Sequence, residues 1–294
     1  TCALPILGLA ASGYRIGLAV GNFEWMASFT LIILGLVFAP FYFRSKIQTL
    51  PEFLEKRYSP TARLILAFIA ILGALLIHIG ISLYAGAKVL EQFFGLNVYI
   101  AIIGIAGITA IYTIIGGLKA VVVTDTIQAV LLLVGAAVLT VLGVVHLEDV
   151  GIDSLAELRE AAKPQQMSMI HPLTKADGTF TEYSWLTGML GYFVLGIWYW
   201  CTDQTIVQKV LGARSEKDGR DGAVFAGFLK ILPVFLMVFP GVIAYLLFAD
   251  QISEPNDTLP VMMKNLLPTG LLGLMVAGLL AALMSTIEAA LNST

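Results

Sequence analysis

The sequence predicts an all-α protein that crosses a membrane many times, and three observations support this fold class. Apolar residues make up 58% of the 294 positions and charged residues only 13%, against about 25% charged residues in an average soluble protein. The mean hydropathy is +0.88, and a soluble fold of this length could not bury so much apolar surface. The apolar residues also form runs of about 20, the length that a helix needs to cross the bilayer core. Because an apolar segment in lipid must satisfy its own backbone hydrogen bonds, we expect these runs to be helices.

The same composition excludes disorder, collagen, a disulfide scaffold and an ordinary cytosolic enzyme. The net charge of −3 is spread thinly over the chain, so there is no basic surface for nucleic acid. Cys2 and Cys201 form neither a metal-ligand nor a disulfide pattern. The predicted spans hold no nucleophile–base pair and no histidine-rich cluster, so we do not expect an enzyme.

The apolar runs predict one partial span, up to about Val20, and seven full spans. The full spans are 23–43, 62–91, 97–115, 119–147, 184–210, 222–248 and 269–292. The chain begins inside one apolar stretch and stops inside another. The sequence is therefore expected to be part of a longer protein.

The connections between the spans predict the orientation of the chain. Lys and Arg concentrate in the short connections 44–63, 116–120 and 211–221, which we therefore place in the cytoplasm. The long segment 148–183 is acidic and contains proline. It is expected to lie outside the bilayer, on the extracellular side, with an amphipathic helical turn at 154–158.

Ionisable side chains inside the spans mark candidate sites, because each costs about 2.5–3.5 kcal/mol at the centre of a membrane helix. Glu24 begins the first full span beside Trp25, where it could also be an interfacial carboxylate. Asp125 lies early in its span, where it could also pair with a Lys or Arg of a loop. Lys230 lies in the sixth full span, where its side chain could also extend to the cytoplasmic surface. His78, in mid-span, is expected to be a buried, hydrogen-bonded histidine rather than a ligand.

Two polar residues, Asp203 and Gln204, interrupt the span 184–210 shortly after the aromatic run 198–200, which itself follows Gly188, Gly191 and Gly196. Glycines followed by aromatic and then polar residues are typical of the broken helices that line transport sites. Helix packing through small residues would also explain the glycines.

The last span places two adjacent hydroxyls, Ser285 and Thr286, in mid-membrane. Hard cations prefer oxygen ligands, and the carbonyl of Ala282 would add a third oxygen from the preceding turn. The pattern is thus compatible with a sodium site. The alternative is a hydroxyl that bonds the carbonyl of the preceding turn.

At these residues the chain closely resembles the sodium/solute symporter family, and within it the sodium–glucose cotransporter branch. The resemblance covers residues 12–294. It rests on LPEFLEKR at 50–57, YTIIGGLKAV at 112–121, TDTIQ at 124–128, WYWCTDQ at 198–204 with IVQ at 206–208, FLK at 228–230 and STIEAALNS at 285–293. The run at 198–204 indicates the sugar branch more than the proline, iodide or pantothenate branches.

The resemblance implies a leucine-transporter-like fold of two inverted five-helix repeats, with the substrate held near the bilayer midplane. Residues 1–294 would form a single transmembrane domain, from the end of the first core helix into the eighth. Residues 1–11 lack the Ser- and Asn-rich pattern of an unwound first helix. The first-helix half of both the sodium and the sugar site is therefore not visible in the sequence.

The resemblance also assigns the substrate site. Glu24 matches a glutamate that hydrogen-bonds a sugar hydroxyl, and Lys230 matches a lysine that reaches the sugar. Tyr199 matches the aromatic residue that stacks on the sugar ring as the inner gate, with Trp200 beside it. These side chains suit a polyol, which needs donors, acceptors and an apolar face to lie on.

For sodium, the resemblance implies the Ala282 carbonyl and the hydroxyls of Ser285 and Thr286 as ligands. Asp125 matches an aspartate near the exit path of the ion. Some members bind a second sodium ion through hydroxyls two to four residues after the serine pair. Here that stretch is Ile287-Glu288-Ala289, so the number of sodium ions stays open.

The function implied by the resemblance is sodium-coupled symport of a hexose or related polyol into the cell by alternating access, from a position in the plasma (inner) membrane. The partners would be sodium, the sugar or polyol and the lipid bilayer, without nucleic acid. Two alternatives stay open: a symporter of sialic acid, an amino acid or a carboxylate, and a solute sensor that does not transport. Tyr199 and Trp200 favour the sugar.

Overall fold

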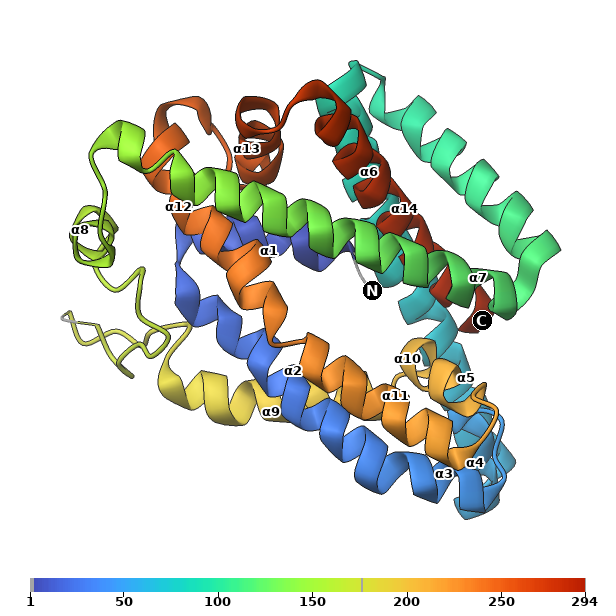
Figure 1. Cartoon of the computed structure of the whole chain (residues 1–294). Coiled ribbons are helices and arrows are strands. Elements are labelled where there is room, and N and C mark those ends of the chain that lie inside the picture. Colours follow the sequence, from blue (N-terminus) through green and yellow to red (C-terminus); the bar gives the residue numbers. More distant parts are fainter. Residues whose placement is uncertain (1–2, 176, 294) are drawn as a thin grey trace.

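The computed structural model describes residues 3–175 and 177–293, with the backbone alone for 3–6, 112 and 116–121. Within these residues its regular structure is helical, with two isolated β-bridges, His171–Ser184 and Thr174–Phe180. The helices, drawn in Figure 1, are α1 (Ala3–Arg15), α2 (Gly21–Ile33), α3 (Ala39–Ser45), α4 (Leu50–Arg57), α5 (Pro60–Leu72), α6 (Gly80–Phe94), α7 (Val98–Val145), α8 (Leu155–Ala161), α9 (Tyr192–Gly196), α10 (Gln204–Leu211), α11 (Glu216–Leu229), α12 (Phe239–Phe248), α13 (Thr258–Leu266) and α14 (Thr269–Ser293).

Six helical segments among the described residues are long and apolar enough to cross a membrane, and each coincides with a predicted full span. They are Leu18–Ser45, Pro60–Phe94, Val98–Ile115, Val122–Val150, Glu216–Gln251 and Thr269–Ser293. Short π-helical segments join α2 to α3 and α5 to α6, and a third, Val234–Val238, leads into α12. The predicted partial span corresponds to α1.

The remaining predicted full span, the fifth, at 184–210, is helical but broken. It runs through α9 and the π-helical segment Ile197–Cys201 and stops at Thr202. Asp203 is extended, with ψ near 128°, and its carboxylate caps α10 by accepting the Thr205 amide hydrogen at 2.8 Å. The predicted interruption at Asp203 is therefore confirmed, because an aspartate at this position favours a helix start over a continuous helix.

The connection predicted at 116–120 was wrong as a loop, since α7 is helical throughout Val98–Val145. A straight helix of this length would measure roughly 72 Å, more than twice the bilayer core. Figure 1 shows instead that the halves of α7 meet at a sharp bend. Gly116 and Gly117 lie between the two candidate spans, and glycine is a frequent cause of helix kinks.

The core lies where α1, α7, α12, α13 and α14 pack together. At the crossing of α1 and α12, a Cβ atom on Gly13 would lie 2.0 Å from the Val238 carbonyl oxygen. A Cβ on Gly241 would lie 2.1 Å from the Ala10 carbonyl oxygen. The two backbones are thus in direct contact, which only glycine permits.

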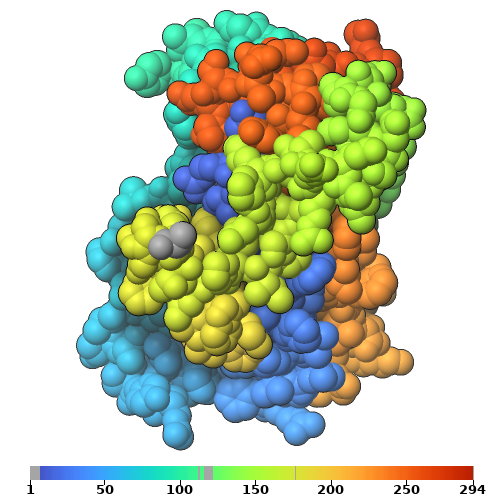
Figure 2. All heavy atoms as spheres, turned by 90° about the vertical axis from the view of Figure 1, so that its left-hand side faces the viewer, coloured from blue at the N-terminus to red at the C-terminus, as the bar shows by residue number. Residues whose placement is uncertain are grey.

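The segment 148–183 covers one end of the helix bundle, where Figure 2 shows it in green to yellow beside the blue N-terminal helices. Its buried Gln166 donates a hydrogen bond to the Tyr14 carbonyl at 3.0 Å and accepts one at its own carbonyl from the Leu18 amide at 2.8 Å. The Lys163 ammonium lies 4.0 Å from the centre of the Tyr245 ring. These contacts fasten the segment to the end of α1. Between the end of α1 and Leu18 the chain turns at Gly17, whose φ of 104° favours glycine.

The expected helical turn at 154–158 is confirmed as the start of α8. Ser154 and Glu157 form a reciprocal capping box. The Asp153 and Ser154 amides and the Ser154 hydroxyl hydrogen-bond Glu157 and hold the pKa of its carboxyl below the usual range.

Replacing Ser154 with alanine is expected to weaken α8 by about 1 kcal/mol, because one N-terminal amide loses its acceptor. Amide hydrogen exchange in 155–161 should then be several-fold faster than in the wild type, while the exposed Ser253→Ala serves as control. Equal exchange in Ser154→Ala and wild type would contradict a stabilising cap.

Candidate functional site

A buried ion pair joins α2 to the end of α11. The Lys230 ammonium lies 2.6 Å from Oε2 of Glu24, and the two side chains are 21% and 1% exposed. Glu24 is therefore not an interfacial carboxylate, and Lys230 does not extend to the surface. The second carboxylate oxygen, Oε1, is buried and has no hydrogen-bond partner among the described residues. Since burying an unpaired charge is costly, each partner makes the burial of the other possible.

The position of Lys230 follows from a break in its span. The helix α11 ends at Leu229, and Pro233 comes three residues after Lys230. Proline lacks an amide hydrogen and clashes with the preceding helical turn, so it ends the helix there. Lys230 thus lies at an interruption within the candidate membrane span Glu216–Gln251.

Aromatic side chains complete this cluster. The Lys230 ammonium lies 4.8 Å from the centre of the Trp200 ring, within the range of a cation–π interaction. The rings of Tyr199 and Trp200 meet edge to face with centroids 4.9 Å apart. The structure therefore brings Glu24, Lys230 and Trp200 together from three elements far apart in the sequence, and Tyr199 touches this cluster through Trp200, its neighbour in the chain.

Tyr199 also lines a small cavity of about 20 Å³ beside α14, together with His78, Thr205, Ile206, Lys209, Ser285, Thr286 and Ala289. The Ser285 hydroxyl oxygen is buried and has no hydrogen-bond partner among the described residues. The Thr286 hydroxyl donates to the Ala282 carbonyl at 3.3 Å, which is the alternative considered from the sequence. His78 is half-buried with its ring 6.3 Å from that of Tyr199, so it faces the cavity rather than a closed core.

Asp125 forms a second ion pair, with Lys209 of α10. The Lys209 ammonium lies 2.6 Å from Oδ2 of Asp125, and the side chains are 29% and 11% exposed. Oδ1 of Asp125 is buried and has no partner in the described part of the chain. Asp125 is thus paired with a basic residue, the alternative considered from the sequence, but Lys209 lies on the helix α10 rather than in a loop. Sequence reasoning did not single out Lys209 as a residue of the cavity.

Glu288 is fully buried on α14, one turn after Ser285. Neither of its carboxylate oxygens has a hydrogen-bond partner among the described residues. An ionisable group in this position costs free energy in a membrane helix. The departure from the family pattern at this residue therefore buries a carboxyl group that has no partner among the described residues.

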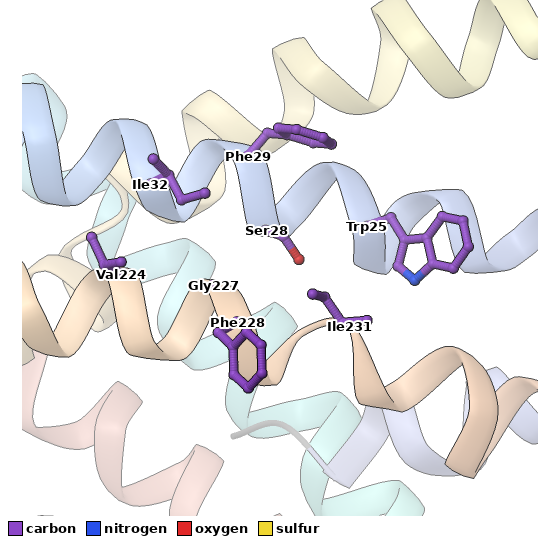
Figure 3. A pocket seen from close by; sticks show the side chains of 8 residues that line it. All are labelled: Trp25, Ser28, Phe29, Ile32, Val224, Gly227, Phe228 and Ile231. Carbon is purple, nitrogen blue, oxygen red and sulfur yellow. The ribbon is translucent and has the colours of Figure 1, made fainter.

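An open groove of about 510 Å³ lies between α2 and α11 (Figure 3). Its lining is Trp25, Ser28, Phe29, Ile32, Val224, Gly227, Phe228 and Ile231. Although Trp25 neighbours Glu24 in the sequence, neither Glu24 nor Lys230 lines the groove. Since nearly all of its surface is apolar, it lacks the donors and acceptors that a polyol needs.

Comparison with known proteins identifies the family. The sequence profile of the Sodium:solute symporter family matches residues 2–294. Among curated proteins, the chain is 36% identical to the sodium/myo-inositol cotransporter of Mus musculus, over 84% of this chain and 37% of that protein. It is 36% identical to the sodium/myo-inositol cotransporter 2 of Homo sapiens, over 90% and 43%. It is 34% identical to the sodium/glucose cotransporter 1 of Oryctolagus cuniculus, over 84% and 39%.

The chain thus spans about two fifths of the length of these relatives. Among solved structures, it resembles the substrate-bound, outward-open state of a Na⁺-coupled sialic acid symporter, with a TM-score of 0.83 and 23% identity. That match covers 99% of this chain and 62% of the other, which confirms the all-α polytopic fold class and its partial extent. In a symporter family sodium is a cotransported ion rather than a bound cofactor, and the family is one of transporters rather than enzymes. The chain belongs to the sodium:solute symporter family.

Proposed function

We propose that the protein is a sodium-coupled symporter of a neutral polyol, of the hexose or inositol class, in the plasma membrane. The observation that carries this proposal is the buried Glu24–Lys230 pair against Trp200, with Tyr199 beside it. A carboxylate, an ammonium and aromatic rings together offer the acceptors, donors and apolar face that a polyol requires. The names of the relatives that carry myo-inositol and glucose support the same class.

The charges of the pair favour a neutral solute. Glu24 and Lys230 compensate each other at 2.6 Å, so an anionic solute would have to compete with Glu24 for the ammonium. It would also leave Glu24 as an uncompensated buried charge, which is strongly unfavourable. Sialic acid and other carboxylates are therefore poorer candidates than a polyol.

For the ion, we propose the Ser285 and Thr286 hydroxyls and the Ala282 carbonyl as oxygen ligands. The buried Ser285 oxygen, unpartnered among the described residues, supports this role. The Thr286 hydroxyl donates its hydrogen to Ala282 and keeps lone pairs for a cation. Asp125, paired with Lys209 on the same cavity, places a negative charge nearby.

One sodium ion would suffice energetically. A charge that crosses 100 mV supplies about 2.3 kcal/mol, and a tenfold sodium gradient adds about 1.4 kcal/mol. Together they support roughly 500-fold accumulation of a neutral solute.

Uptake by the full-length protein tests the proposal. Labelled glucose, galactose, myo-inositol, sialic acid and proline are offered with sodium and with choline replacing sodium. We expect sodium-dependent uptake of a hexose or of myo-inositol, and little of the acids. Uptake of sialic acid or proline in preference would overturn the substrate class. Sodium-dependent binding of a polyol without uptake would instead identify a sensor.

Tyr199→Phe is expected to retain several-fold more uptake than Tyr199→Ala, because the phenylalanine ring preserves the edge-to-face contact with Trp200 and the surface for a sugar ring. Uptake is measured per molecule at the cell surface. If both variants were equally inactive, the hydroxyl rather than the ring would carry the role of Tyr199.

A further inference from the structure

Lys209 lies between the carboxylate of Asp125 and the proposed sodium site, so the lysine and a sodium ion would compete for Asp125. Its ammonium is 2.6 Å from Asp125 of α7, and it lines the same small cavity as Ser285 and Thr286 of α14. A sodium ion at these hydroxyls would therefore have a fixed positive charge as its neighbour. The nearby carboxylate already has one oxygen occupied by the lysine, while its other oxygen has no partner among the described residues.

The helix that carries Lys209 is short and begins at a break. The helix α10 starts at Gln204, directly after the extended Asp203, so it is not continuous with the helical segment before it. Two adjacent side chains near the C-terminal end of α10 contact other helices. Lys209 binds Asp125 of α7, and the side-chain amide of Gln208 donates to the Ala289 carbonyl of α14 at 2.8 Å. One contact is ionic and the other is neutral.

We propose that Lys209 is a tethered cation that holds Asp125 in the absence of sodium and is displaced when sodium binds beside Ser285. The inference rests on the proposed sodium site. A cation in the cavity attracts Asp125 and repels the Lys209 ammonium, so it weakens the ionic contact. The neutral contact of Gln208 is unaffected. Sodium would thereby release α10 from α7 while α10 stays attached to α14, the helix that binds the ion.

This arrangement makes Lys209 a positioning residue that sets the affinity for sodium. Removing its charge leaves Asp125 available to the ion and removes the repulsion. The affinity for sodium should therefore increase when Lys209 becomes neutral, whereas loss of an ordinary structural contact would leave it unchanged or lower it.

The test is equilibrium binding of ²²Na⁺ to the purified full-length protein in detergent, without sugar. We expect Lys209→Gln to lower the half-saturating sodium concentration by at least about threefold. Lys209→Arg keeps the charge and should stay within about twofold of the wild type. A Lys209→Gln protein with wild-type sodium affinity would overturn the inference. If the wild-type protein itself bound no sodium, the proposed function would fail as well, so the two failures are distinguishable.

Hydrogen exchange of the α10 segment gives a second readout. In the wild type, adding sodium should increase amide exchange across 204–211. In Lys209→Gln, exchange should already be high without sodium and change little on its addition. If stranding Asp125 prevents folding, the double variant Lys209→Gln with Asp125→Asn removes both charges and should also lose the sodium response. A wild-type sodium response in either variant would overturn the inference.

Discussion

Replacing Glu24 with alanine in the full-length protein is expected to weaken polyol binding by about 1–3 kcal/mol, or roughly five- to 150-fold. The substitution removes an acceptor for a sugar hydroxyl. It also leaves the Lys230 ammonium, which is only 21% exposed, without its carboxylate. Lys230→Ala is expected to have an effect of similar size, because it strands the buried Glu24. Binding of labelled polyol at saturating sodium measures both variants.

A matched control is available at the surface. Glu55 pairs with Arg63 at the same distance of 2.6 Å, but the Arg63 and Glu55 side chains are 50% and 35% exposed, and pairs with this much solvent access contribute little. Glu55→Ala should therefore bind the polyol like the wild type. Glu24→Gln keeps a polar group of nearly the same shape and should fall between wild type and Glu24→Ala. Wild-type affinity in both Glu24→Ala and Lys230→Ala would refute the proposed substrate site.

The spans were predictable because each depends on a local property, the apolar content of about 20 consecutive residues. For the same reason Asp203 indicates a break from the sequence, since a helix-capping carboxylate acts within one turn. The break before Pro233 was not inferred from the sequence, although a missing amide hydrogen acts just as locally. Both breaks are present, and each lies close to a residue of the site: the first, at Asp203, comes three residues after Trp200, and the second begins at Lys230, where α11 ends.

The pairing of charged residues was not predictable in this way. Glu24 and Lys230 are 206 positions apart, and Asp125 and Lys209 are 84 apart. Nothing in the spacing of either residue along its own helix identifies a partner on another helix. The general rule that buried charges are paired predicts that partners exist, and only the fold selects them.

The bend of α7 is a feature that the sequence predicts only in part. The basic residue and the two glycines at 116–120 correctly separate two spans, yet the chain remains helical across them. Composition indicates where a membrane helix must change direction. It does not indicate whether the backbone leaves the helical conformation there, because that depends on local geometry. Glycine permits either outcome.

The double substitution Ser285→Ala with Thr286→Ala is expected to raise the sodium concentration needed for half-maximal uptake by roughly tenfold or more, a loss of about 1.4 kcal/mol. Each alanine removes one hydroxyl oxygen and no backbone group. Ser285→Ala alone should have the greater effect of the two single variants, because its oxygen is buried without a partner among the described residues, whereas the Thr286 hydroxyl is already bonded to Ala282. Sugar affinity at saturating sodium should change much less than the sodium requirement.

The double variant distinguishes a packing role of Ser285 and Thr286 from a role in binding the ion. If Ser285 and Thr286 only pack, the double variant lowers the amount of protein at the surface but leaves the sodium dependence of each folded molecule unchanged. If they bind the ion, reciprocity requires that the sodium-induced gain in sugar affinity also decreases. Thr140 provides a control, since its hydroxyl likewise donates to the carbonyl of the preceding turn but lies on α7; Thr140→Ala should leave the sodium dependence unaltered. A half-saturating sodium concentration within about twofold of the wild type in the double variant, a difference of about 0.4 kcal/mol, would exclude these hydroxyls as sodium ligands.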